Sequence, residues 1–278
     1  MPNNAWYTPY KCPPSTCLSI GLSQGIVYEM SDGVVVKLPF QYPTKSKFYD
    51  ILAKNQHPNL AQRLQTKLPI GIVLPYYKPS RKVWGINTTA TRFAWIKQLV
   101  SAVAWLENLG YMHGDLKVVN MGIDSHNQVK LFDFGSVRHR DDEGFAEQVV
   151  EDQFALAMCI YFLASGIDLL AKSNSRVEVQ RTLNMLKRGQ GIVDEAARDF
   201  DQVIQAGWTG NLSSFSSLSK DITDIGNNVP VQLKEFQPKV HLNLDYSAIA
   251  EDHRWMNEEV YRTAWKTEGY DTPDNIWD

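Results

Sequence analysis

Two short clusters of polar residues lie near the middle of the chain. The first is His-Gly-Asp-Leu-Lys at 113–117, followed by Asn120, and the second is Asp-Phe-Gly at 133–135. Carboxylate and amide oxygens are the ligands that magnesium prefers, and an ammonium group neutralises phosphate oxygens. A carboxylate can also orient or deprotonate an attacking hydroxyl. These residue types are the ones that a triphosphate with its metal ions requires.

The two clusters resemble the catalytic loop and the Asp-Phe-Gly motif of protein kinases. The spacing inside the first cluster and the distance to the second both match that family. Each carboxylate alone has an ordinary alternative as a helix cap or a turn residue, but the ensemble favours the kinase interpretation. The resemblance covers about residues 18–225. Over this range the chain resembles small atypical fungal kinase-like proteins with a short activation segment. It implies an α+β, two-lobed protein-kinase-like fold with a small β-rich N-lobe and a helical C-lobe.

The resemblance also implies a role for each residue of the clusters. Asp115 would orient or deprotonate the acceptor, and Lys117 would lie along the transferred phosphoryl group. Asp133 would chelate magnesium directly, and Asn120 would hold the second metal ion. Asp152 would tie down the backbone of the catalytic loop. The implied cofactors are ATP and Mg²⁺.

Residues upstream resemble the phosphate-binding part of the same family. Val-Val-Val-Lys at 34–37 is similar to the strand that presents the phosphate-binding lysine, which makes Lys37 the candidate. A lone lysine is more often an ordinary exposed residue, and only its distance from the downstream motifs favours the functional role. Gly21, Ser23 and Gly25 resemble the glycine-rich loop, with serine for one glycine and one residue fewer. Their backbone amides would cradle phosphates.

The run Gly-Ile-Val-Leu-Pro-Tyr-Tyr at 71–77 resembles the last N-lobe strand and the hinge that follows it. Under this resemblance Leu74 lies behind the adenine. The Pro75 carbonyl and the Tyr77 amide would be the hydrogen-bond partners of the base. Proline is compatible with that position because it contributes only an acceptor.

The surrounding pattern predicts the elements that must position these residues. Between 18 and 39, short β-branched runs alternate with glycine and a Ser-Asp-Gly turn, which predicts antiparallel strands joined by hairpins. Apolar spacing predicts a short helix at 44–55, a strand at 70–77, helices at 88–110, 152–165 and 194–206, and a serine-rich loop before another helix. We expect an N-terminal arm at 1–17, the N-lobe at 18–77, the C-lobe at 78–225 and a C-terminal extension at 226–278.

Three departures from the kinase pattern limit the analogy. No glutamate occurs between Glu29 and Glu107, where active kinases place the partner of the phosphate-binding lysine. Lys45 occupies the natural position, so either Asp50 substitutes or Lys37 is positioned otherwise.

The other two departures concern control and substrate. Gly114 replaces the arginine that receives a phosphorylated activation loop, so this form of control is not expected. The stretch from Gly135 to Asp152 is about half the length that a protein kinase uses and contains no Ala-Pro-Glu. The platform that grips a peptide substrate is therefore expected to be missing.

Composition narrows the classes of protein. Among 278 residues, 44% are hydrophobic and 21% charged, which is an ordinary globular balance, and the net charge of −3 gives no general attraction to nucleic acid or anionic lipid. We expect a cytoplasmic protein with no membrane partner, because no signal-like start or bilayer-length apolar run occurs. Cys12, Cys17 and Cys159 are expected to be reduced thiols.

Three functions remain open at this level, because a fold does not fix a reaction. The first is an ATP-dependent phosphotransferase with an unknown acceptor, either a small molecule or an unusual protein site. The second is a pseudokinase that serves as a scaffold or binding module. The third is a kinase fold repurposed for nucleotidyl transfer, or for peptide-bond formation from aminoacyl-tRNA, in which case tRNA is a partner.

Overall fold

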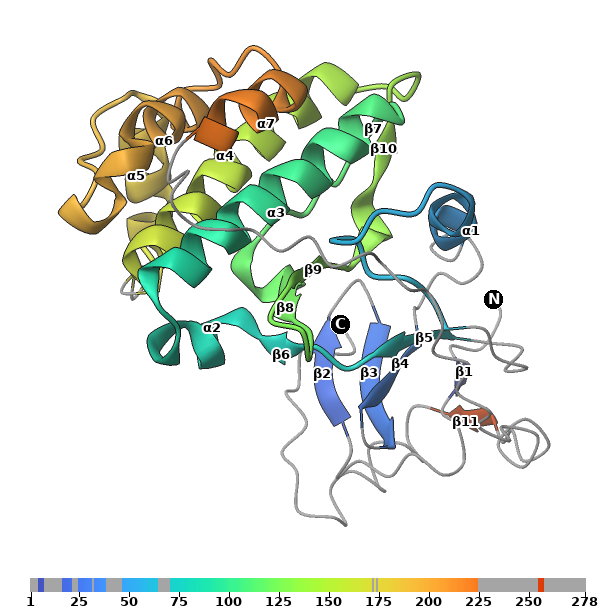
Figure 1. The fold of residues 1–278 in the computed structure, drawn as a ribbon. Helices are drawn as coiled ribbons and strands as arrows, with labels where there is room; N and C mark the ends of the chain where they lie inside the picture. The colour runs from blue at the N-terminus through green and yellow to red at the C-terminus, as the bar shows by residue number, and fades with distance from the viewer. Residues whose placement is uncertain are drawn as a thin grey trace. The chain divides into compact units, whose positions relative to one another are not determined.

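The computed structural model describes residues 5–7, 17–21, 25–31, 33–38, 47–64, 71–171, 173, 175–224 and 255–257. They belong to two compact units (Figure 1). The first contains Met1–Gln56, Ala61–Tyr76 and Gln237–Asp278, and the second contains His57–Leu60 and Tyr77–Phe236. A small β-sheet dominates the described part of the first unit, and helices dominate the second, which is the α+β kinase-like architecture expected from the sequence.

The sheet of the first unit is antiparallel, with its strands in the order β2-β3-β4-β5. The strands are Cys17–Gly21 (β2), Gly25–Ser31 (β3), Val34–Leu38 (β4) and Ile72–Pro75 (β5). Gly33 turns the chain between β3 and β4 with a φ of +78°, a conformation that favours glycine. The strands expected at 18–39 and 70–77 are therefore confirmed. A separate pair joins Ala5–Tyr7 (β1) to Trp255–Asn257 (β11).

One helix of the first unit is described, α1 at Lys47–Lys54. It buries Phe48, Tyr49 and Leu52, which recur at helical spacing. The expected helix at 44–55 is confirmed over these residues. Its first expected turn, including Lys45, lies outside the described residues.

Five short strands of the second unit surround the two polar clusters. Lys78–Pro79 (β6), Met121–Ile123 (β8) and Val129–Leu131 (β9) form a three-stranded antiparallel sheet, while Tyr111–Met112 (β7) pairs with Arg138–His139 (β10). The first cluster follows β7, and the second lies between β9 and β10. Pairing of β7 with β10 therefore closes the loop that carries both clusters.

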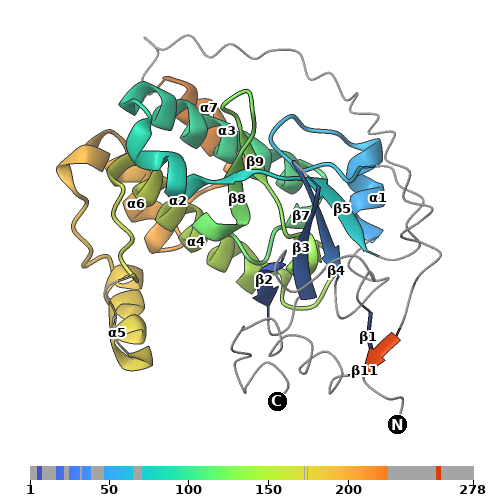
Figure 2. The same ribbon diagram turned by 90° about the horizontal axis from the view of Figure 1, so that it is seen from below.

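The remainder of the second unit is helical (Figures 1 and 2). The α-helices are Ser80–Val83 (α2), Thr89–Asn108 (α3), Phe145–Ser165 (α4), Arg176–Lys187 (α5), Asp201–Trp208 (α6) and Phe215–Asp224 (α7). Short 3₁₀ turns are Trp84–Ile86 (η3), Val118–Asn120 (η4), Phe134–Ser136 (η5) and Glu195–Phe200 (η6). Helices α3 and α4 contribute many of the buried apolar side chains of this unit, including the fully buried Trp95, Leu99 and Leu156. None of the helices in the described part of the chain is both long and apolar enough to span a bilayer.

The helices differ from the expectation in three respects. Helix α4 begins at Phe145 rather than at 152, because Gly144 starts it in a left-handed conformation and its polar first turns continue the helix. The expected helix at 194–206 is divided into η6 and α6. Helix α5 was not predicted, since only Leu186 of its side chains is buried and its apolar periodicity is weak. Figure 2 shows α5 standing apart from the other helices of its unit.

Candidate active site

The first polar cluster forms a tight turn around the buried His113. The Asp115 backbone N–H donates to His113 Nδ1 at 3.2 Å, so the ring proton is on Nε2, which donates to the Phe132 carbonyl at 3.0 Å. Burial lowers the pKa of His113 to about 4, which keeps the ring neutral at physiological pH. The imidazole therefore accepts a hydrogen bond within the first polar cluster and donates one to the backbone just before the second.

Asp152 on α4 accepts hydrogen bonds from the backbone of the same turn. Its Oδ2 accepts the His113 N–H at 2.7 Å, and its Oδ1 accepts the Gly114 N–H at 3.1 Å and the side chain of Gln148 at 3.0 Å. The side chain is 1% exposed. Burial raises the pKa of Asp152 to about 6, although the three donors oppose that rise. These contacts are the ones that the sequence assigned to Asp152.

Gly114 occupies a position that excludes any side chain. Its φ is +77°, and a Cβ added there would lie 2.1 Å from the Ser136 carbonyl oxygen. A contact that short requires the backbone of one of the two turns to move. The glycine that replaces the expected arginine therefore allows the first cluster to pack directly against the turn that follows Asp133.

Asp115, Lys117 and Asn120 form one hydrogen-bonded set. Lys117 Nζ lies 2.8 Å from Asp115 Oδ2. Asn120 Nδ2 donates to the same oxygen at 3.0 Å and to the Asp115 carbonyl at 2.8 Å. The Asp115 side chain is 23% exposed and that of Lys117 is 46% exposed, so the set is accessible on one side. The 3₁₀ turn η4 brings these residues together, since it folds Asn120 back onto the loop.

Asp133 stands in the left-handed region, with φ of 67° and ψ of 61°. A non-glycine residue in this conformation costs about 1–2 kcal/mol, so the surrounding contacts must hold it. Phe132, immediately before it, donates its N–H to the Asn120 carbonyl at 3.0 Å and accepts from His113 at its own carbonyl. Phe134, immediately after it, is buried and packs on the His113 ring at 5.3 Å. Both neighbours of Asp133 are thus fixed to the first cluster.

The donor set fits a magnesium ion that shares its coordination with phosphates. Asn120 uses its amide NH₂ on Asp115, so the atom suited to a metal is its Oδ1, alongside the Asp133 carboxylate. No group of three or more His, Cys, Asp or Glu in the described part of the chain is arranged to hold a metal ion. Magnesium in phosphoryl-transfer sites is typically held by one or two carboxylates plus phosphates and water, which suits this small set.

The candidate nucleotide residues of the first unit lie on its sheet. Lys37 is on β4, paired in register with Val27 and Ile72, and is 8% exposed. Asp50, the acid that could replace the missing glutamate, is exposed and pairs with Arg63 at 2.6 Å in the same unit. This pairing favours the alternative in which Lys37 is positioned otherwise.

The short glycine segment forms a β-hairpin. Gly21 ends β2 and pairs with Gly25 at the start of β3, so the connection has the place expected of a phosphate loop. Ser23 lies outside the described residues. Only the flanks of the candidate loop are therefore located.

The hinge candidates are divided between the two units. In the first unit, Leu74 is buried on β5, and Pro75 pairs with Val34 at the end of that strand. In the second unit, the Tyr77 ring stacks on Phe132 at 6.2 Å, and burial raises the pKa of its hydroxyl. Tyr77 is thus packed within its own unit.

Sequence reasoning missed three supporting groups: the Phe132 backbone, the Gln148 side chain and the Ser136 carbonyl. Gln148 precedes Asp152 by one helical turn, a signal that was lost because the helix was expected to begin at 152. Backbone groups such as those of Phe132 and Ser136 leave no signal in residue type. Cys159 is buried, and burial raises its pKa to about 12, which agrees with an inert thiol.

Comparison with known proteins identifies several kinases. No family model matches the chain. It is 42% identical over 62 residues to the serine/threonine-protein kinase oca2 of Schizosaccharomyces pombe, which covers 22% of this chain and 10% of that protein. It is 24% identical over 174 residues to the serine/threonine-protein kinase AtPK1/AtPK6 of Arabidopsis thaliana, which covers 53% and 37% respectively. It is 34% identical over 95 residues to the CBL-interacting serine/threonine-protein kinase 13 of the same plant, which covers 31% and 18%.

These matches cover between a tenth and little more than a third of the three relatives. All three relatives are named as serine/threonine kinases, which supports a kinase-like transferase at the level of the family. None of their names refers to tRNA, so the comparison gives no support to a tRNA partner.

Proposed function

Because the chain is protein-kinase-like in sequence and in fold, we propose that it is an ATP- and magnesium-dependent phosphotransferase of an atypical kinase type. The observation that carries this proposal is the hydrogen-bonded set of Asp115, Lys117 and Asn120, which is tied through Phe132 to the strained turn at Asp133. Strained residues that the surrounding structure holds in place are concentrated at functional sites.

Each residue of the set has a chemical role under this proposal. Asp115 orients the acceptor hydroxyl and accepts its proton as the oxygen attacks the γ-phosphorus. The bond from the γ-phosphorus to the bridging oxygen breaks, and ADP leaves with that oxygen. Lys117, held 2.8 Å from Asp115, neutralises charge on the transferred group. Asn120 and Asp133 would hold magnesium, which supplies charge neutralisation on the phosphates.

The acceptor is proposed to be a small molecule or an unusual protein site. Only residues 137–144 separate η5 from α4, and β10 uses two of them in its pairing with β7. A segment this short leaves little chain to align an extended peptide beside Asp115. The early start of α4 shortens it further than the sequence indicated.

A pseudokinase is the second candidate, and the pairing of Asp50 with Arg63 favours it. Protein kinases need an ion pair between the phosphate-binding lysine and a helical glutamate for full activity. With no glutamate between Glu29 and Glu107, that pair cannot form with the usual partner. Under this alternative the chain binds a partner protein and transfers no phosphate.

Transfer of radiolabelled phosphate from Mg-ATP distinguishes the two candidates. Water and a panel of small hydroxylated molecules serve as acceptors, and only a phosphotransferase should transfer the label. We expect Asp115→Asn to reduce turnover by about a hundredfold or more while nucleotide binding is retained. Asp141→Asn, at an exposed carboxylate outside the set, is the matched control and should retain turnover. Turnover that is equal in the wild type, Asp115→Asn and the control would refute the catalytic role of Asp115.

A further inference from the structure

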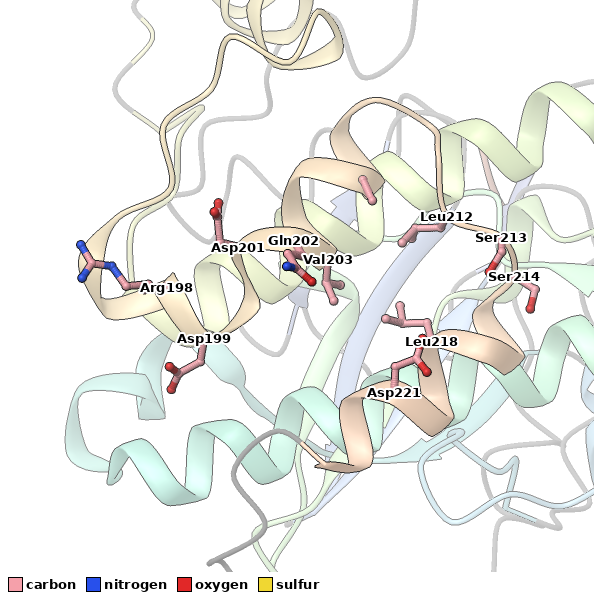
Figure 3. A pocket seen from close by; sticks show the side chains of 11 residues that line it. Arg198, Asp199, Asp201, Gln202, Val203, Leu212, Ser213, Ser214, Leu218 and Asp221 are labelled. Carbon is pink, nitrogen blue, oxygen red and sulfur yellow. The ribbon is translucent and has the colours of Figure 1, made fainter.

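A groove of about 630 Å³ lies in the helical part of the second unit, bordered by η6, α6 and α7 (Figure 3). All of its lining residues fall between 198 and 221, so none belongs to the two polar clusters. The apolar lining residues are Val203, Ala206, Leu212 and Leu218, and the polar ones are Arg198, Asp199, Asp201, Gln202, Ser213, Ser214 and Asp221. The proposed phosphotransfer makes no use of this groove.

The walls of the groove are fixed by hydrogen bonds. Gln153 of α4 donates its side-chain amide to the Leu212 carbonyl at 2.8 Å and accepts the Leu212 N–H at 3.2 Å. Ser214 caps α7, because its Oγ accepts the Ser217 N–H at 3.0 Å. Both sides of the groove are therefore preorganised, which reduces the entropy cost of binding.

The floor of the groove is apolar. In Figure 3 the side chains of Val203, Leu212 and Leu218 come from different segments and point toward the same space. Leu218 is 4% exposed, whereas Val203 and Leu212 are half-buried and remain accessible. A guest side chain placed there would bury apolar surface chiefly of Val203 and Leu212, with Leu218 beneath them, and such burial is the usual source of affinity in grooves of this kind.

The rim of the groove carries uncompensated negative charge. Asp199, Asp201 and Asp221 are exposed, and in the part of the chain that the structure describes their side chains make no hydrogen bond or ion pair. Arg198, the one basic residue of the lining, is paired with Glu195. The free carboxylates would repel phosphate-bearing ligands, including nucleic acids and anionic lipids, and would attract cations.

We propose that this groove docks a short segment of a partner protein in which lysine or arginine residues flank an apolar side chain. The apolar side chain enters between Val203 and Leu218, and the basic residues lie over the three aspartates. Charge complementarity sets the specificity, and apolar burial supplies the affinity. The proposal does not depend on the proposed phosphotransferase activity.

The test is fluorescence anisotropy of the full chain with a labelled peptide of alternating lysine and leucine. We expect saturable binding that weakens with salt, because exposed charge pairs are screened. The combined substitution Asp199→Asn, Asp201→Asn and Asp221→Asn should weaken binding by about tenfold. Ala206→Phe, which fills the groove from a half-buried position, should abolish it.

A matched control removes the same number of charges elsewhere. The combined substitution Glu147→Gln, Glu151→Gln and Glu178→Gln changes exposed acids of α4 and α5 that do not line the groove, and it should retain the wild-type affinity. Thermal unfolding of each variant confirms that it is folded. Equal loss of affinity in the control, or equal binding of a peptide with serine in place of leucine, would overturn the proposal.

Discussion

The turn at His113 and Gly114 and the segment 137–144 are held in place in different ways. His113 and Gly114 are tied by buried hydrogen bonds to Asp152, a residue distant in the sequence. The segment 137–144 is mostly exposed. Its backbone pairs with β7, and the Arg140 N–H donates to the Gly110 carbonyl at 2.8 Å. Its side-chain hydrogen bonds are local, such as the Asp142 carboxylate that accepts the His139 N–H at 2.7 Å. The geometry of the turn at His113 and Gly114 therefore depends on a buried side chain distant in the sequence, whereas the exposed segment is held by backbone pairing and by local side-chain contacts.

The largest expected effect follows from removing the buried carboxylate. Asp152→Ala leaves the N–H groups of His113 and Gly114 without their acceptor. Each unsatisfied buried donor costs about 1–3 kcal/mol, so we expect the free energy of unfolding to fall by about 4 kcal/mol. Chemical denaturation measures it. Asp152→Asn retains an acceptor oxygen and should lose less, and equal losses in the two variants would contradict this account.

The free energy of unfolding should depend on pH, because His113 binds a proton less readily in the folded chain than in the unfolded one. Its pKa is lowered from 6.5 to about 4 in the folded chain, so the unfolded chain binds the proton more readily between these values. Stability is therefore complete above pH 6.5 and falls as the pH decreases toward 4, by about 3 kcal/mol for this group. Burial lowers the pKa of His57 to about 4 as well, which adds in the same direction.

The contribution of Asp152 to stability changes with pH in the opposite direction. Its pKa is raised from 3.8 to about 6, so the folded chain binds this proton more readily, and its contribution to stability declines as the pH rises from 4 to 6.

We expect His113→Asn to reduce the slope of the unfolding free energy against pH by an amount that corresponds to about one proton. Unfolding free energies at pH 7 and pH 5 measure this slope. An unchanged slope in this variant would show that His113 is not the titrating group.

A smaller loss of stability is expected at Gly114. Gly114→Ala sets a Cβ 2.1 Å from the Ser136 carbonyl oxygen, and the resulting displacement should cost about 2–3 kcal/mol and reduce turnover. Gly189→Ala is the matched control, because its φ of +69° imposes a similar backbone strain but its Cβ would meet only Thr209 at 3.4 Å. Thermal unfolding and turnover are measured together. Similar effects at the two glycines would refute the packing argument.

The smallest effect is expected in the exposed segment. Asp141 is 83% exposed, and its pair with His139 lies at the surface. We expect Asp141→Asn to change the free energy of unfolding by less than about 0.5 kcal/mol. Chemical denaturation at neutral pH checks this. A loss comparable to that of Asp152→Ala would contradict the distinction between the two regions.

The sequence was sufficient for the motifs and for the long elements. The spacing of Asp115, Asn120 and Asp133 identified the residues that the second unit gathers around one loop, and apolar periodicity located α3. The sequence was insufficient where the side chains of a helix are mostly exposed or polar, because the apolar periodicity is then weak. Helix α5 exposes most of its side chains, and the first turns of α4 are polar, so neither carried a clear apolar pattern.

Close approaches of the backbone were also beyond the sequence. The missing arginine at position 114 was visible, but its physical reason, the Ser136 carbonyl, appeared only in three dimensions. The same holds for Asp50. The sequence left open whether Asp50 substitutes for the missing glutamate or Lys37 is positioned otherwise, and in the structure the Asp50 carboxylate pairs with Arg63. Residue types locate candidates, and tertiary contacts decide which partners they have.

The most direct test of the proposed function is thermal unfolding of the purified chain with and without ATP, each with and without magnesium. A ligand that binds only the folded state at 100 times its dissociation constant adds about 2.7 kcal/mol of stability. We predict a magnesium-dependent rise of the midpoint that is lost in Asp133→Asn and retained in Asp141→Asn. No rise in the wild type, or an equal rise in Asp133→Asn, would contradict the proposal that these residues form a working nucleotide and metal site.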